Sequence, residues 1–252
     1  MDLETRQLQQ RLQQLEQLPE VLLVKPITRS TNDDVREIAK KGMQSVLVYS
    51  HQQTAGRGQR QRQWVSPEGN IYLSTLLNLN TALDGRLALE IALNILQMPS
   101  LQALDLQVKW PNDLYSLQGK WGGILIEPIS ATQVVVGVGL NIDPVASTVI
   151  DQAATALTHL GLSNTSRVAL VAELYCAIQQ AGLWFDHACQ NLAARFNHHA
   201  AFMQQTVEFE HVNGVVQGQF LGIQNDGAVM IETADGVQHF YQGRLRLSEA
   251  QA

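Results

Sequence analysis

The pattern of apolar residues changes close to residue 206, and this change limits the possible folds more than any other feature of the chain. Up to that point, apolar stretches of strand length alternate with stretches that have the helical spacing of apolar residues. From Thr206 onward only short strands are indicated, with turn signals at 225–227 and 234–236. A chain of 252 residues can bury one large core with a small domain beside it. We therefore expect an α+β protein that ends in a small all-β domain.

The elements expected in the larger part follow from residue spacing and from the positions of Gly and Pro. Three leucines recur at helical spacing within residues 1–20, which predicts a short N-terminal helix. Thr31 and Asp34 match a capping box, which would open a helix that ends at Gly42, whereas the Pro-Asn-Asp string at 111–113 is typical of a hairpin turn. The other expected elements are strands at 21–24, 45–50, 71–77, 107–110, 120–127 and 134–141, and helices at 83–98 and 166–201. The expected domain organisation is a short helix at 1–20, a larger domain at 21–205 and the all-β domain at 206–252.

Charge and cysteine content exclude several classes of protein. Lys and Arg number 17 against 23 Asp and Glu, a net charge of -6, whereas a nucleic-acid-binding module is normally basic. No stretch approaches the about 18 apolar residues of a membrane span, and the N-terminus lacks the features of a signal sequence. Cys176 and Cys189 stand outside any CxxC or Cys/His cluster, which predicts two buried free thiols. We expect a soluble cytoplasmic protein that binds neither DNA nor a membrane.

A long loop over residues 51–70 carries the first group of residues with chemical significance. Its Gly56-Arg57-Gly58 string lets backbone N–H groups approach an anion while the arginine supplies positive charge. Between Glu37 and Glu68 the chain has no acidic residue, although the protein as a whole is acidic. We expect an anion-binding site here, against the alternative of a solvated basic loop. The basic residues of this interval are Lys40, Lys41, Arg57, Arg60 and Arg62.

Lys120 opens the second group of residues with chemical significance. It begins an apolar strand with Gly122 and Gly123 behind it, where a ligand can approach the backbone and a lysine can point into a pocket. The alternative is a lysine exposed to water at the end of a strand. Known nucleotide loops do not match, because a Walker A loop would need glycine where Leu114 stands and a dinucleotide fingerprint would need glycine where Ile142 stands.

Taken together and in order, these strings resemble the motifs of biotin protein ligases. The resemblance spans about residues 21 to 247 and implies the fold of that family. This fold is a mixed sheet with flanking helices, similar to class II aminoacyl-tRNA synthetases, followed by a small SH3-like β-barrel. The strings are Ser30-Thr31-Asn32, Gln53-Thr54-Ala55-Gly56-Arg57-Gly58, Trp64-Val65-Ser66-Pro67-Glu68-Gly69-Asn70-Ile71-Tyr72, Lys109-Trp110-Pro111-Asn112-Asp113, Lys120 with Gly122-Gly123-Ile124-Leu125, and Gly137-Val138-Gly139-Leu140-Asn141.

The activity that the resemblance implies has two steps and uses Mg²⁺ with the substrates biotin and ATP. Biotin and Mg-ATP give biotinoyl-5′-AMP, and the biotin then passes to one lysine of a biotin carboxyl carrier protein, the acceptor domain of a biotin-dependent carboxylase. Some members also repress genes through an N-terminal winged helix, but here few residues precede the first motif. We therefore expect a ligase that is not a DNA-binding repressor; a ligand-dependent homodimer stays open.

The resemblance also implies a role for individual residues. Lys120 should bridge the biotin carboxylate and the α-phosphate, and Arg57 with the N–H groups of the loop should hold the same junction. Polar side chains should hydrogen-bond the ureido ring of biotin. The implied catalytic residues are Lys120 and Arg57, the implied biotin contacts are Ser30, Thr31, Asn32, Gln53, Gly56, Arg57, Gly58, Gln59 and Lys120, the implied ATP contacts are Arg57, Arg60, Arg62, Asn112, Asp113 and Asn141, and Asp113 is also the implied Mg²⁺ ligand.

Two departures and two alternatives accompany this interpretation. Gln59 and Gln61 stand where the family's loop is often more basic, which leaves open how tightly the loop retains the adenylate. Trp64 and Trp110 are expected to pack and fix their loops rather than to stack on adenine. The alternatives are a lipoate or octanoate ligase of the same superfamily, and a non-catalytic biotin-binding sensor. The Gly-Arg-Gly string favours biotin, and Lys120 argues against a sensor.

Overall fold

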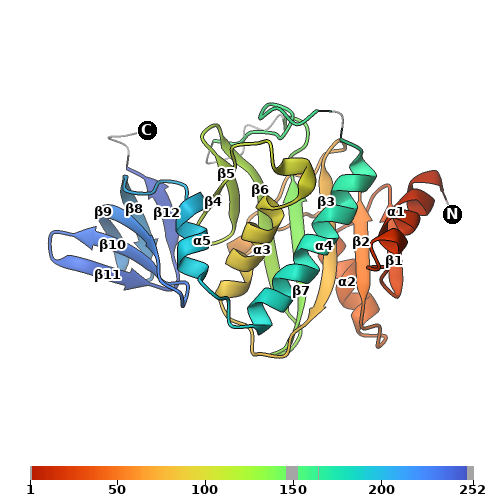
Figure 1. Ribbon diagram of the computed structural model, residues 1–252, viewed down its shortest axis with the longest axis horizontal. Coiled ribbons are helices and arrows are strands. Elements are labelled where there is room, and N and C mark those ends of the chain that lie inside the picture. Colours follow the sequence, from red (N-terminus) through yellow and green to blue (C-terminus); the bar gives the residue numbers. More distant parts are fainter. Residues whose placement is uncertain (1, 146–152, 164, 249–252) are drawn as a thin grey trace.

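The computed structural model describes residues 2–145, 153–163 and 165–248, which form two sheets with flanking helices (Figure 1). The larger sheet has seven strands in the order β1-β2-β3-β7-β6-β5-β4, and the smaller has five in the order β11-β10-β9-β8-β12. The elements are α1 (Leu3–Gln14), β1 (Val21–Lys25), α2 (Thr31–Ala39), β2 (Val46–Ser50), η1 (Gln59–Gln61), β3 (Ile71–Asn78), α3 (Arg86–Leu96), η2 (Pro99–Leu101), β4 (Gln107–Lys109), β5 (Asp113–Ser116), β6 (Gly119–Pro128), β7 (Gln133–Leu140), α4 (Arg167–Asp186), α5 (Leu192–His199), β8 (Thr206–His211), β9 (Gly214–Ile223), β10 (Val229–Thr233), β11 (Gly236–Phe240) and β12 (Arg244–Leu247).

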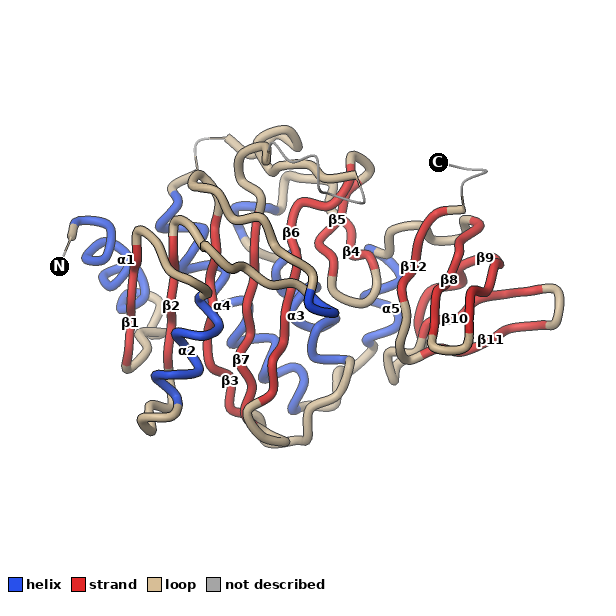
Figure 2. The backbone as a smooth tube through the Cα atoms, turned by 180° about the vertical axis from the view of Figure 1, so that it is seen from behind, coloured by secondary structure: helices blue, strands red, loops and turns tan. Residues whose placement is uncertain are grey.

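The seven-stranded sheet is mixed, because β1 and β2 run parallel while every other neighbouring pair is antiparallel. Helices α3 and α4 cover one face, and α2 lies on the other (Figures 1 and 2). The central strands carry apolar side chains on both faces, so both faces have to be covered. A mixed sheet with flanking helices confirms the expected fold class at this level.

The smaller sheet is antiparallel throughout and lies beyond β4, next to α5 (Figure 1). Trp110 joins the two sheets: its indole Nε1 donates a hydrogen bond of 3.1 Å to Gly227 O, and its ring centroid lies 5.6 Å from that of Phe209. Asn197 of α5 adds a second connection, because its Oδ1 accepts from Ile223 N at 2.8 Å. One continuous apolar core therefore reaches from α1 into the smaller sheet.

Three expected elements differ from those observed. The turn at 111–113 is followed by a strand, β5, which sequence patterning missed because it has only four residues. The helix expected over 166–201 is two helices, since Ala188, Cys189 and Asn191 adopt positive φ between them. Asp34 does not cap α2; its carboxylate accepts from Lys25 and Thr28 instead.

Helix α4 corrects another expectation. It is the one helix of the described residues that is long and apolar enough to cross a membrane, with a mean hydropathy of 1.3, whereas no such stretch was expected from the sequence. Its buried residues include Leu170, Tyr175 and Phe185, and it packs on α1, α3 and β3. The apolar composition of α4 therefore follows from its position in the core.

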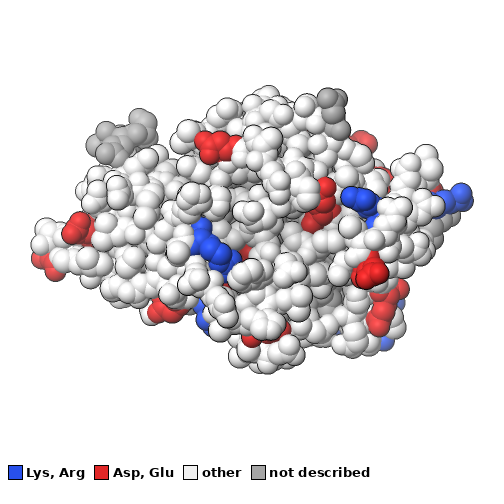
Figure 3. Space-filling model, in the orientation of Figure 1, with Lys and Arg blue, Asp and Glu red and all other residues white. Residues whose placement is uncertain are grey.

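Charged side chains are sparse and scattered on the face of Figure 1, which agrees with a charged fraction of 16% (Figure 3). Both cysteines are free. Cys189 is buried, and burial raises the pKa of its thiol to about 12, whereas Cys176 is only half-buried. The expectation of two free thiols is confirmed, but only one of them is fully buried.

Candidate active site

A cavity of about 440 Å³ opens where the long loop, the start of α2 and the strands β4 to β7 meet. This volume is in the range of small-molecule sites. Apart from Gly56, every residue that the sequence indicated for the site lines the cavity, and Arg244 reaches it from the smaller sheet. Gly56 packs behind the lining, where an added Cβ would meet Ser66 Oγ and Trp64 O at 2.5 Å. The residues brought together are Ser30, Thr31, Asn32, Gln53, Arg57, Gly58, Gln59, Arg60, Arg62, Asn112, Asp113, Lys120 and Asn141.

One end of the cavity is a polar floor whose side chains are hydrogen-bonded to one another. Gln53 Oε1 accepts from the N–H of Thr31 at 2.9 Å, while Gln53 Nε2 donates to Ser66 Oγ at 3.1 Å. Ser74 Oγ lies 2.6 Å from both Thr31 Oγ1 and Asn32 Oδ1. These groups come from α2, β3 and the loop, and all but Gln53 are buried, so the floor is rigid before any ligand enters.

Glycines make room for this floor. A Cβ added at Gly137 would lie 2.2 Å from Asn32 Oδ1, and one at Gly139 would lie 2.6 Å from Trp64 Nε1. A Cβ at Gly123 would come within 3.2 Å of Lys120 Nζ. These three glycines, one on β6 and two on β7, thus admit the side chains of Asn32, Trp64 and Lys120 that a Cβ would crowd.

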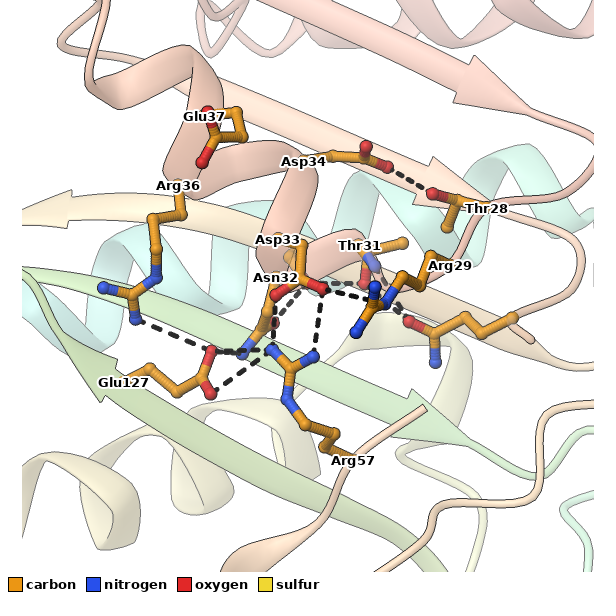
Figure 4. Close-up of polar contacts among 12 residues, drawn as sticks. Thr28, Arg29, Thr31, Asn32, Asp33, Asp34, Arg36, Glu37, Arg57 and Glu127 are labelled. Atoms are coloured by element: carbon orange, nitrogen blue, oxygen red, sulfur yellow. Dashed lines mark hydrogen bonds and ion pairs between the residues drawn. The ribbon is translucent and has the colours of Figure 1, made fainter. Parts of the chain in front are cut away.

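The guanidinium of Arg57 contacts carboxylates beside the polar floor (Figure 4). It donates to both oxygens of Asp33, at 3.0 and 2.6 Å, and lies 3.4 Å from the carboxylate of Glu127. The same Glu127 accepts from Asn32 Nδ2 at 2.9 Å and pairs with Arg36 at 3.7 Å. The Arg57 hydrogen bond holds the pKa of Asp33 below its ordinary value, and the carboxylates raise the pKa of Arg57.

Lys120 lies at the other end of the cavity. Its Nζ donates to Asp113 and lies 5.2 Å from the ring centroid of Trp64. The Lys120 ammonium lies beside Gly123. Glu127 follows Gly123 by four residues on β6, so the backbone positions of these two residues are about 13 Å apart at the usual ~3.3 Å per strand residue. The structure therefore places the Lys120 ammonium beside Gly123 and the Arg57 guanidinium beside Glu127, at different points along β6.

A second lysine at this end was not singled out from the sequence. Lys109 Nζ lies 3.9 Å from the carboxylate of Asp113 and 5.5 Å from the ring centroid of Tyr115. Lys109 is only 5% exposed, so two ammonium groups flank a single carboxylate in a largely buried setting. The sequence feature that could have indicated a role for Lys109 is its position directly before the Trp-Pro-Asn-Asp string, on the strand that leads to Asp113.

Asp113 alone does not fit a resident Mg²⁺ ion. Its carboxylate already faces two lysines, and Mg²⁺ prefers several oxygen ligands in octahedral geometry. In the part of the chain that the structure describes, no three His, Cys, Asp or Glu side chains gather as a metal site. The carboxylate of Asp113 instead orients Lys120.

The two asparagines indicated for the nucleotide line the cavity but also hold its strands together. Asn112 Nδ2 donates to Ile124 O at 2.6 Å, and Asn141 Nδ2 donates to Thr155 O at 3.2 Å. Arg60 is exposed, and its φ of 55° bends the η1 turn at the cavity mouth. Trp110 is buried and packs against the smaller sheet, whereas Trp64 is half-buried, lines the cavity and lies beside the Lys120 ammonium.

Comparison with known proteins agrees with this geometry. Residues 24–141 match the Biotin/lipoate A/B protein ligase family. The bifunctional ligase/repressor BirA of Escherichia coli is 30% identical over 245 residues, which cover 90% of this chain and 74% of the relative. The chain belongs to the biotin/lipoate protein ligase family. A biotin–[acetyl-CoA-carboxylase] ligase of Mycobacterium tuberculosis is 29% identical over 197 residues, covering 74% and 73% of the two chains.

Solved structures of other ligases share the fold. The biotin protein ligase of Aquifex aeolicus, in complex with biotin and ATP, superposes with a TM-score of 0.78 at 23% identity and covers 91% of this chain and 100% of that one. The biotin acetyl coenzyme A carboxylase synthetase of Helicobacter pylori, with biotinylated ATP bound, gives a TM-score of 0.63 at 20% identity, with coverages of 87% and 99%. The fold of a biotin protein ligase is thereby confirmed.

Proposed function

We propose that this member of the biotin/lipoate protein ligase family is an ATP-dependent biotin protein ligase. It forms biotinoyl-5′-AMP from biotin and ATP and then transfers the biotin to a lysine of a biotin carboxyl carrier protein. The observation that carries the proposal is the cavity with a polar, hydrogen-bonded floor at one end and the Lys120 ammonium at the other. A molecule with a polar ring at one end and a carboxylate at the other matches this distribution of groups.

Biotin lies in the cavity with its ureido ring on the polar floor. Ser30, Thr31, Asn32 and Gln53 supply hydrogen-bonding groups to the ring, and its carboxylate extends toward Lys120. A lipoate or octanoate chain has no polar ring, so binding it would leave these buried groups without ligand partners and would cost affinity. The floor therefore favours biotin over the two acyl chains.

The adenylation step brings a carboxylate oxygen onto the α-phosphorus of ATP, forming a C–O–P bond as pyrophosphate leaves. Two anions meet, so positive charge and N–H donors are needed at the junction. The Lys120 ammonium, oriented by Asp113, supplies the charge, and Gln59 in the same cavity wall offers its backbone N–H, whereas the N–H of Gly58 already donates to Arg62 O. Arg60 and Arg62 at the mouth contact the ATP phosphates, while Asn112 and Asn141 contact the nucleotide. Mg²⁺ enters as part of the Mg-ATP substrate.

In the transfer step, the amine of the acceptor lysine attacks the activated carbonyl. An amide bond forms, the acyl–phosphate bond breaks, and AMP leaves with the electron pair, while the amine loses a proton. The acceptor enters from the cavity mouth near η1.

We also propose that the large domain is related to class II aminoacyl-tRNA synthetases and that the smaller sheet is an SH3-like barrel.

The test is a competition among three carboxylic acids. The purified protein is incubated with Mg-ATP and an equimolar mixture of biotin, lipoate and octanoate, and the adenylates are measured by mass spectrometry. Biotinoyl-AMP alone supports the proposal. Lipoyl-AMP or octanoyl-AMP would instead assign the chain to the lipoate or octanoate ligases, and a folded protein that binds biotin but forms no adenylate would be a sensor.

A further inference from the structure

Arg57 lies at the base of a turn that closes on itself over the cavity. Gly58 N donates to Arg62 O at 2.8 Å, and Trp64 N donates to Gly56 O at 2.9 Å. Arg57 and Gln63 also form an isolated antiparallel bridge. These bonds shape the turn internally, whereas the Arg57 side chain leaves the turn and joins it to Asp33 on α2 and Glu127 on β6 (Figure 4).

One of the carboxylates that hold Arg57, that of Glu127, also reaches the polar floor. Glu127 accepts from Asn32 Nδ2, Asn32 Oδ1 lies 2.6 Å from Ser74 Oγ, and the chain of hydrogen bonds continues through Thr31 to Gln53. Arg29, Arg36 and Arg57 face Asp33 and Glu127, so three cations surround two carboxylates before a ligand arrives. The guanidinium is satisfied in this cluster and does not need a ligand anion.

We propose that Asp33 and Glu127 are positioning residues of the ligase: both act through Arg57 to hold the loop 56–64 over the cavity, and Glu127 also acts through Asn32 to set the polar floor. This inference rests on the proposed function in so far as the bound molecule is biotin. Arg57 then contributes to binding through the placement of its backbone and of the N–H groups that follow it. Neither Asp33 nor Glu127 has to touch the substrate.

If the Arg57 guanidinium instead contacted the ligand directly, removing the Asp33 carboxylate would change biotin binding in the opposite direction. In that case Asp33 and Glu127 would compete with the ligand anion for the guanidinium, and Asp33→Asn would release Arg57 and tighten biotin binding. If the carboxylates instead anchor the loop, Asp33→Asn loosens the loop and weakens biotin binding. The sign of the change distinguishes the two roles.

The experiment compares Asp33→Asn, Glu127→Gln, Arg57→Gln and the double variant Asp33→Asn/Arg57→Gln in the full chain. Hydrogen exchange of the amides of residues 57–64 is measured without ligand, and the Kd for biotin is measured by calorimetry. We expect loop exchange and the Kd to rise by about 5- to 10-fold in each single variant. The double variant should show no further change beyond Arg57→Gln, because Arg57→Gln already removes the contact that Asp33→Asn removes. Asp33→Glu, which keeps the charge, should recover most of the wild-type behaviour.

Glu37→Gln is the matched control, because Glu37 lies on the same helix and pairs with Lys40 outside the cluster. It should leave both measurements unchanged. Tighter biotin binding in Asp33→Asn, additive effects in the double variant, or loop exchange that equals that of the control would overturn the inference. If the wild-type protein does not bind biotin, the proposed function fails, and the exchange measurement still decides whether Asp33 and Glu127 hold the loop.

Discussion

Lys120 is the side chain on which the proposed adenylation depends most, because its ammonium lies inside the cavity beside Asp113. We expect Lys120→Ala to lower the rate of biotinoyl-AMP formation by about 10²- to 10³-fold, the usual effect of removing one donor at a site of developing charge. Single-turnover kinetics measure this rate. Lys40→Ala, which removes an exposed lysine directly after α2, should not change this rate. Adenylate formation at the wild-type rate in Lys120→Ala would refute the role.

Asp33 also makes a pH-dependent contribution to stability. The hydrogen bond from Arg57 lowers its pKa below the ordinary 3.8, so the folded state favours the carboxylate more than the unfolded state does. The stabilisation is present above pH 3.8 and disappears as the pH falls through the lower folded value. We expect Asp33→Asn to lower the free energy of unfolding at pH 6 and to have a smaller effect near pH 3. Urea unfolding at both pH values checks this, and an effect that grows toward pH 3 would contradict it.

At the residue scale, most residues that line the cavity could be identified from the sequence, because the sequence motifs place charged residues next to glycines. The sequence could not give the direction of a side chain. The resemblance implied that Arg57 holds the carboxyl–phosphate junction, and the structure adds that its guanidinium contacts Asp33 and Glu127, which no sequence pattern predicted. These two acids come from a helix and from a strand far away in the sequence, and only the fold shows that they meet.

At the scale of elements, α3 and α5 are held together by a buried ion pair. The Glu90 carboxylate is fully buried and accepts from Arg195, with one N–O distance of 2.9 Å. Arg195→Met should lower the free energy of unfolding by about 3 kcal/mol, because it leaves a buried carboxylate without its partner. Urea denaturation measures the loss. Arg6→Met, at an exposed position of α1, is the control, and an equal effect in both variants would show that the pair is not responsible.

Long elements with clear periodicity were predicted well, and short or interrupted ones were not. The strands β3, β6 and β7 agree with the sequence to within one residue at each end. The four-residue strand β5 was missed, since its pairing with β6 rather than its own composition makes it a strand. The break after α4 was also missed, because positive φ at Ala188 and Cys189 carries no sequence signal such as glycine.

At the scale of the whole molecule, the two sheets share a core and should unfold together. Trp110 contacts both Phe209 and Gly227 of the smaller sheet, and Asn197 bonds to Ile223. All four tryptophans precede residue 206, so their fluorescence reports on the larger part, whereas circular dichroism reports on both. We expect the two signals to give the same urea midpoint. Trp110→Ala should separate the midpoints, and separate midpoints in the wild-type protein would contradict a shared core.

The glycines of β6 and β7 restrict how this protein can change over evolutionary time. Positions 137 and 139 admit no larger residue while Asn32 and Trp64 keep their places, whereas a Cβ at position 123 would meet the end of the Lys120 side chain and Trp64 at 3.2 Å and is less restricted. Inherited changes in ligand preference can arise in the loop or on α2 without disturbing these glycines, because the side chains there reach the cavity from outside the sheet. A survey of all single substitutions would find strand positions that tolerate almost nothing beside loop positions that tolerate many residues.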